Sequence, residues 1–372
     1  MQKERRYDLD WLRVLVFALL IFYHVGMFFV PWGFHIKNDI IYDWLRWPMI
    51  FLNQWRLPIL FVISGMGTAF ALGHRSIGAF VKERYIRLAI PLGVGMLLIV
   101  PPQVYIERLA NGDFTGSYWA WLTGPAYQGV YPSGNISWHH LWFLPYLFIY
   151  SLLLSPVFAL VRSRYINQLQ SLGEKLSRKA GWLYLLVIPL FLYESLLEPF
   201  FNVTHNLVHD WFNFISSMTL FLYGFLMIQM GKKLWEAVHR LRKIAPVIGV
   251  LCYCGQLIIW FNFEDSITVH FTEALLKTTN LWSWILTIFA WARLYLNQSS
   301  PQLAYANRAV YPFYILHQTL TLIIGYFMMR VSYSLAVEFL IMVVGTFLGS
   351  WLIYEGVILR TRVTRVMFGV KG

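Results

Sequence analysis

Residues 141–161 read LWFLPYLFIYSLLLSPVFALV, a run of 21 residues without Asp, Glu, Lys or Arg. A helix rises about 1.5 Å per residue, so this run is about 30 Å long and matches the hydrocarbon core of a bilayer. Further charge-free runs of 17 to 21 residues occur at 57–73, 88–106, 211–231, 244–263 and 309–329. Repeated runs of this length predict a polytopic membrane protein.

The composition of the 372-residue chain supports the same class. Hydrophobic residues make up 58% and charged residues 13%, against about 45–50% and about 25% in soluble domains. A soluble enzyme, a disordered chain, a collagenous repeat and a disulfide scaffold are therefore excluded. Cys252 and Cys254 lie inside an apolar run, where we expect buried packing residues, and their spacing predicts neither a disulfide nor a metal site.

The hydropathy pattern predicts an all-α, polytopic helical bundle with about ten transmembrane helices, forming a single domain over residues 1–372. The predicted spans are 11–31, 55–73, 87–106, 140–161, 182–200, 211–230, 244–263, 278–296, 309–329 and 335–356. With the N-terminus inside, cytoplasmic segments hold 23 Lys and Arg residues and outer segments hold 6. Basic residues resist translocation, so both termini are predicted to be cytoplasmic. The net charge of +12 then reflects topology, and no nucleic-acid partner is expected.

The longest connection, 102–139, is predicted to face outward and is rich in aromatic residues: Tyr118, Trp119, Trp121, Tyr127, Tyr131 and Trp138. Two interpretations remain open. The aromatic side chains anchor the loop at the membrane interface, or they form a stacking surface for a sugar or a lipid head group.

Three ionisable residues of the first span, Asp10, Arg13 and His24, are spaced so that they share one face of a helix. Ionisable side chains inside a span are costly unless they are paired or face water, which makes them functional candidates. Arg13 and His24 are separated by about 16 Å along the axis, which suits a long substrate. The alternative is that Arg13 extends to lipid head groups and His24 binds a backbone carbonyl.

Five short elements resemble those of the family-3 membrane acyltransferases, the group that includes glucan biosynthesis protein C succinyltransferases and O-antigen acetyltransferases. The opening YDLDWLR (7–13), followed after ten residues by His24, is similar to the Arg-x10-His signature of that family. The other elements are FVISG (61–65), RYIRL (84–88), HLWFL (140–144) and YPFYILH (311–317). The opening has Trp11 where many members have Gly, which points to a subgroup and leaves the acceptor open.

The chemistry of acyl transfer agrees with the resemblance. A base must take the proton of the acceptor hydroxyl, and histidine, with an unperturbed pKa of about 6.5, suits this role. We therefore expect His24 to be the general base and Arg13 to be an orienting charge for the donor or for Asp10. Arg84 and Arg87, at i and i+3 on the cytoplasmic side, are predicted to bind the phosphates of an acyl-CoA donor, in a donor site that also includes Asp10.

Further residues are candidates for positioning the acceptor or relaying a proton. His140 and His317 are candidates by residue type, although an intramembrane His is often a packing residue. Glu194, on one face with Glu198, is a candidate partner for the His24 imidazolium. Ser64-Gly65 favours close helix packing over an acyl-carrying nucleophile.

The sequence therefore predicts a multi-pass O-acyltransferase of the bacterial inner membrane. It is expected to move an acyl group, acetyl or succinyl, from cytoplasmic acyl-CoA to a hydroxyl of an envelope carbohydrate or glycolipid reached from the outer side. No permanently bound cofactor is expected, acyl-CoA acts as co-substrate, membrane lipids surround the chain, and a homo-oligomer is left open. The alternatives are a secondary transporter of a small anionic or acylated solute and a membrane cytochrome with His24, His140 or His317 as haem ligands.

Overall fold

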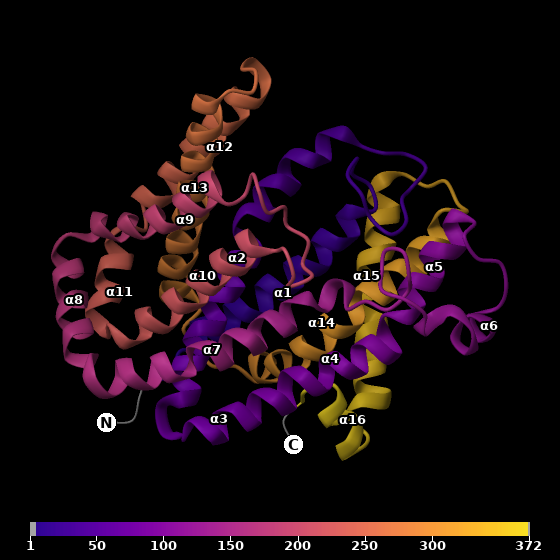
Figure 1. Ribbon diagram of the computed structural model, residues 1–372, viewed down its shortest axis with the longest axis horizontal. Helices are drawn as coiled ribbons and strands as arrows, with labels where there is room; N and C mark the ends of the chain where they lie inside the picture. The colour runs from indigo at the N-terminus through magenta and orange to yellow at the C-terminus, as the bar shows by residue number, and fades with distance from the viewer. Residues whose placement is uncertain (1–4, 371–372) are drawn as a thin grey trace. The chain divides into compact units, whose positions relative to one another are not determined.

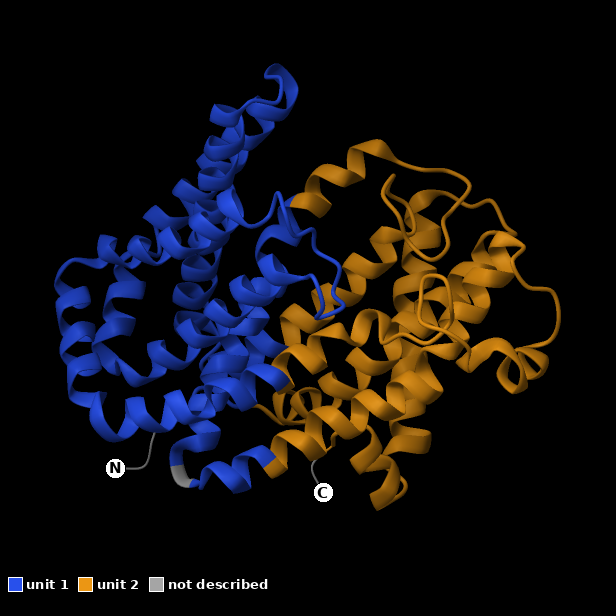
Figure 2. Cartoon of the chain, viewed as in Figure 1, with its two compact units in different colours: residues 1–13, 51–81, 149–299 blue, residues 14–50, 82–148, 300–372 orange. Residues whose placement is uncertain are grey.

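The computed structural model describes residues 5–370, except for the side chain of His74. Within this range the chain is helical with no strands, and it forms two compact units (Figure 2). Unit 1 comprises residues 1–13, 51–81 and 149–299, and unit 2 comprises residues 14–50, 82–148 and 300–372. Along the chain, four helices begin in one unit and end in the other: α1 (Tyr7–Met27), α2 (Arg46–Ala71), α3 (Ile77–Arg84) and α7 (Phe143–Arg164).

The remaining elements of unit 1 are η2 (Leu72–His74), α8 (Ile166–Arg178), η7 (Ala180–Leu186), α9 (Val187–Leu196), α10 (Trp211–Gln229), α11 (Lys232–Arg240), α12 (Ile244–Asn262) and α13 (Ile267–Tyr295). The long helices α12 and α13 form a hairpin (Figure 1). Cys252 on α12 is buried as predicted, whereas Cys254 is exposed, because two residues correspond to about 200° around a helix.

Unit 2 contains η1 (Asp43–Leu45), η3 (Tyr85–Ala89), α4 (Ile90–Val94), η4 (Gly95–Ile99), α5 (Pro101–Asn111), α6 (Tyr118–Thr123), η5 (Pro125–Tyr127), η6 (His139–Trp142), α14 (Pro301–Met328), α15 (Leu335–Ile353), η8 (Tyr354–Ile358) and α16 (Arg362–Met367). The elements η3, η4 and η8 are π-helical turns, and the other η elements are 3-10 helices. Helix α14 packs against α5 and α15.

Within residues 5–370, seven helical stretches are long and apolar enough to cross a membrane: Tyr7–Met27, Asp43–Ala71, Ile77–Asn111, His139–Arg164, Trp211–Gln229, Ile244–Asn262 and Leu335–Ile358. The pair Ile166–Arg178 and Ala180–Leu196, bent by 119°, makes eight if it is one span. The structure thus has an all-α, multi-pass architecture, with seven or eight such spans instead of about ten. The predicted spans 278–296 and 309–329 form parts of α13 and α14, where buried polar residues such as Asn280 and Gln318 lower the mean hydropathy.

Helices α2 and α10 approach backbone to backbone within unit 1. A Cβ atom at Gly65 would lie 1.9 Å from the carbonyl oxygen of Phe221, and a Cβ atom at Gly224 would lie 1.9 Å from that of Val62. Small residues permit such close helix contacts in membranes. The Ser64-Gly65 pair therefore serves close packing, as the sequence predicts.

Two prolines of the Ile77–Asn111 stretch leave helix carbonyl groups without their usual N–H donors, and tyrosine hydroxyls bind these carbonyls instead. Pro91 has no N–H for the carbonyl of Arg87 four residues earlier, and the Tyr311 hydroxyl donates to that oxygen at 2.7 Å. In the same way Pro101 frees the carbonyl of Leu97, which accepts a 2.7 Å bond from the Tyr127 hydroxyl. These bonds satisfy backbone groups that would otherwise be costly in an apolar environment.

Candidate functional site

A pair of histidines from α1 and α14 forms the centre of the candidate site in unit 2. The Nδ1 atom of His24 lies 2.7 Å from the Nε2 atom of His317, with ring centroids 4.9 Å apart. His317 is fully buried at 0% exposure, whereas His24 is only partly buried. His24 is thus the accessible member of the pair.

Hydrogen bonds fix the roles of the four ring nitrogens. His317 Nδ1 lies 2.6 Å from the carbonyl oxygen of Tyr314, and a carbonyl only accepts, so Nδ1 carries the proton. In neutral His317, Nε2 is then an acceptor, and His24 Nδ1–H donates to it. Neutral His24 consequently presents an unprotonated Nε2, and this nitrogen is the one able to take a proton from a substrate.

His140 joins this pair from η6. Its ring centroid lies 5.1 Å from that of His317, and its Nε2–H donates to the carbonyl of Ile315 at 3.0 Å. Its Nδ1 accepts from the side-chain amide of Gln103 at 3.3 Å. Because both ring nitrogens are engaged, the geometry favours a positioning role for His140. The structure therefore brings together the three histidines that the sequence singled out as candidates.

A second dyad, His35 and Glu107, lies outside the set of residues that the sequence predicts for the site. His35 Nδ1 bonds to Glu107 Oε2, and Glu107 is only 6% exposed. The Tyr131 hydroxyl donates to the other carboxylate oxygen at 3.0 Å. Burial, together with the charge of Glu107, raises the pKa of Tyr131 to about 12, so the phenol stays protonated and remains a donor. The only sequence signal for the dyad is the position of Glu107, directly after the charge-free run 88–106.

Two glutamines connect the dyad to the histidine cluster. The side-chain amide of Gln318 donates to His35 Nε2 at 3.0 Å and to Gln103 Oε1 at 3.3 Å, and Gln103 in turn reaches His140. Since His35 Nε2 accepts this bond, His35 Nδ1 carries the proton that Glu107 binds. Within residues 5–370, no group of three His, Cys, Asp or Glu side chains is arranged to hold a metal ion.

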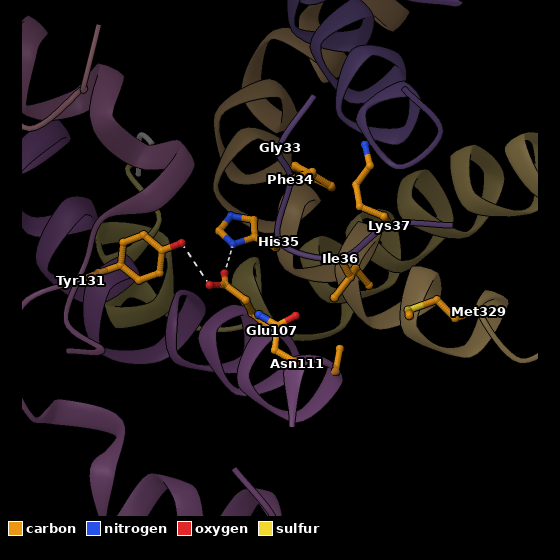
Figure 3. Close-up of a pocket in the computed structure, with 10 residues that line it drawn as sticks. Gly33, Phe34, His35, Ile36, Lys37, Glu107, Asn111, Tyr131 and Met329 are labelled. Atoms are coloured by element: carbon orange, nitrogen blue, oxygen red, sulfur yellow. Dashed lines mark hydrogen bonds and ion pairs between the residues drawn. The ribbon is translucent and has the colours of Figure 1, made fainter. Parts of the chain in front are cut away.

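A pocket of about 620 Å³ opens beside the dyad (Figure 3). Its wall includes Phe34, whose ring stacks on His24 with centroids 6.5 Å apart and an interplanar angle of 11°. Lys37 also lines the pocket, but its ammonium group donates to the carbonyls of Val30, of Met27 at 2.6 Å and of Trp32 at 2.9 Å, and so caps the end of α1. Burial lowers the pKa of Lys37 to about 8.

The other predicted site residues have local partners. In unit 1, Asp10 pairs with Arg5 at 3.1 Å. The Glu194 carboxylate, a predicted partner of His24, binds Lys277. The partner of His24 in the structure is His317. Arg13 lies close to α2, because a Cβ atom placed on Gly67 would be 3.4 Å from Arg13 Nη2. In unit 2, Arg87 pairs with Glu83 at 3.8 Å. Arg84 is the last residue of α3.

Comparison with known proteins places the chain in a family. The family described as "Acyltransferase domain" matches residues 6–355. Glucans biosynthesis protein C of Escherichia coli O139:H28 (strain E24377A / ETEC) is 24% identical over 337 residues, covering 87% of this chain and 83% of that protein. The protein of the same name from Escherichia coli strain K12 is 24% identical over 335 residues, with the same coverage. No solved structure matches the chain. The chain therefore belongs to the family-3 membrane acyltransferases and is an enzyme that transfers acyl groups other than amino-acyl groups.

Proposed function

We propose that the protein transfers an acyl group, acetyl or succinyl, from cytoplasmic acyl-CoA to a hydroxyl of an envelope carbohydrate reached from the outer side of the bacterial inner membrane. The family supplies the reaction class. The carbohydrate acceptor is supported by relatives whose name assigns them to the biosynthesis of glucans. No resident cofactor is required, because a thioester is already an activated acyl donor.

The observation that carries the proposal is the oriented pair of His24 and His317. The acceptor hydroxyl gives its proton to His24 Nε2 while its oxygen attacks the thioester carbonyl. The resulting imidazolium still donates from Nδ1 to neutral His317, which in turn is fixed by the Tyr314 carbonyl. When the tetrahedral intermediate collapses, the C–S bond breaks and the thiolate of coenzyme A leaves and receives the proton from His24.

The experiment measures transfer by the purified protein in detergent, with labelled acetyl-CoA or succinyl-CoA and short β-linked glucose oligosaccharides. Mass spectrometry should detect the acyl increment on the sugar. Detergent abolishes any gradient, so a secondary transporter would leave both compounds unchanged. Lack of transfer to any carbohydrate, in protein that remains folded, would contradict the proposed acceptor.

The donor assignment yields a separate prediction for Arg84 and Arg87. Changing both to Ala should weaken acyl-CoA binding by about tenfold or more, because hydrogen bonds to charged groups contribute about 1.5–3 kcal/mol each. Changing both to Lys should retain part of the affinity, because charge remains while the bidentate guanidinium geometry is lost. Titration calorimetry with acyl-CoA measures both effects. Unaltered affinity in a correctly inserted double Ala variant would rule out this donor site.

A further inference from the structure

The pocket beside His35 presents acceptor groups for hydroxyl hydrogens. Each oxygen of the Glu107 carboxylate accepts one described bond, from His35 or from Tyr131. A carboxylate has about four acceptor positions, so both oxygens retain capacity for a ligand. Asn111 lies four residues after Glu107 on α5, lines the same pocket and is exposed, and its amide offers both donors and an acceptor.

The charge of the pocket disfavours an anionic ligand. Glu107 is the acidic group of its wall, and the ammonium group of Lys37 points away from it toward the end of α1 (Figure 3). A buried carboxylate disfavours phosphates and other anions. The rings of Phe34 and Tyr131 add apolar faces to the lining. Hydroxyl-accepting oxygens beside aromatic faces suit a sugar, and the volume of about 620 Å³ lies within the range of about 300–1,000 Å³ typical of small-molecule sites.

One wall residue of the pocket contacts His24, the candidate base. Phe34 is part of its wall and stacks on the ring of His24, so a ligand against Phe34 lies one aromatic ring away from the candidate base, which does not itself line the pocket. Its lining segments, 33–37 and the loop that holds Tyr131, belong to connections predicted to face outward. We propose that this pocket is the acceptor site, that it binds a neutral sugar residue of a glycan through Glu107, Asn111 and Tyr131, and that Phe34 aligns the reacting hydroxyl with His24. This inference rests on the proposed function and adds the binding site of its acceptor.

The test uses full-length protein in detergent and compares Asn111→Ala and Tyr131→Phe with a matched control. Tyr127→Phe is that control, because Tyr127 belongs to the same connection but its hydroxyl donates to the Leu97 carbonyl and does not line the pocket. Each pocket variant removes one hydrogen-bonding group at an accessible position, so we expect the KM for short β-linked glucose oligosaccharides to rise about threefold to tenfold. The KM for acyl-CoA should not change, and the control should keep the acceptor KM of the unmodified protein.

A direct binding measurement tests the pocket independently of the acyl-transfer reaction. Without acyl-CoA, titration of the unmodified protein with the oligosaccharide should give a saturable signal that both pocket variants weaken by the same factor as their KM values. Normal oligosaccharide affinity in both variants, in protein that still transfers acyl groups, would overturn the pocket and leave the proposed function intact. Competition between coenzyme A alone and the oligosaccharide would also overturn it, because the pocket would then belong to the donor. If the unmodified protein transfers to no carbohydrate, the proposed function fails, and the acceptor pocket fails with it.

Discussion

Replacing His24 with Gln is expected to lower the rate of acyl transfer by a factor on the order of 10²–10⁴, the usual contribution of a general base. Glutamine keeps approximate size and can still donate a hydrogen bond to His317, but it cannot take up a proton near neutral pH. Acyl-CoA affinity should remain almost unchanged, because the imidazole acts on the acceptor hydroxyl. Steady-state transfer kinetics and acyl-CoA titration on the same preparation separate the two quantities.

The matched control is His270→Gln in unit 1, where the imidazole Nε2 donates to the Ser195 carbonyl at 2.9 Å and has no part in the proposed chemistry. This variant should transfer at a near-normal rate. In the unmodified enzyme the rate should fall on acidification, because a protonated imidazole cannot act as a base. If His24→Gln transfers at a near-normal rate and its rate falls on acidification as in the unmodified enzyme, the general base is another residue.

Replacing Gly65 with Ala is expected to cause a large loss of stability, comparable to that of the same change at Gly224. The new Cβ atom would lie 1.9 Å from the Phe221 carbonyl oxygen. A backbone carbonyl, unlike the end of a flexible side chain, cannot move away without a shift of its helix. Overpacking costs about 1–3 kcal/mol and sometimes more, and here α2 and α10 must separate. We expect a lower melting temperature in detergent and less protein in the membrane.

Gly78→Ala is the matched control, since a Cβ atom at this position meets no atom within 4 Å apart from its chain neighbours and the nearby backbone of its own helix, and Ala has a higher helix propensity than Gly. The double variant Gly65→Ala, Gly224→Ala tests the mechanism. Both methyl groups force apart the same pair of helices, so their combined cost should be smaller than the sum of the single costs. Additive costs, or a Gly65→Ala protein as stable as the Gly78→Ala control, would disprove the contact.

Apolar runs and their spacing are sufficient to predict the architecture, but not the number of spans. Of the six charge-free runs, five correspond to stretches that can cross a membrane, and the sixth, 309–329, corresponds to α14. The number of spans differs because α13 and α14 bury polar side chains such as Asn280 and His317. A hydropathy average does not distinguish such residues from those that contact water.

The site was predictable where its residues lie in apolar helices. His24, His140 and His317 are conspicuous because an imidazole is costly in such a setting, and the structure unites them. His35 lies in a connection between α1 and α2, where a histidine needs no special explanation. Its significance depends on contacts with Glu107 and Gln318, which are 72 and 283 residues away along the chain. Sequence spacing contains no information about such contacts.

Much of the polar framework of unit 2 is completed by α14, which is synthesised late. The Tyr311 hydroxyl binds the carbonyl freed by Pro91, the Thr319 hydroxyl binds the Ile99 carbonyl at 2.6 Å, and the Tyr314 hydroxyl binds the His140 carbonyl at 2.7 Å. While a ribosome is still adding residues before position 301, these three earlier carbonyls lack the hydroxyl donors that α14 supplies. In a nascent chain of that length these carbonyls need other donors, such as water, and the site is complete only when α14 has packed against the earlier helices.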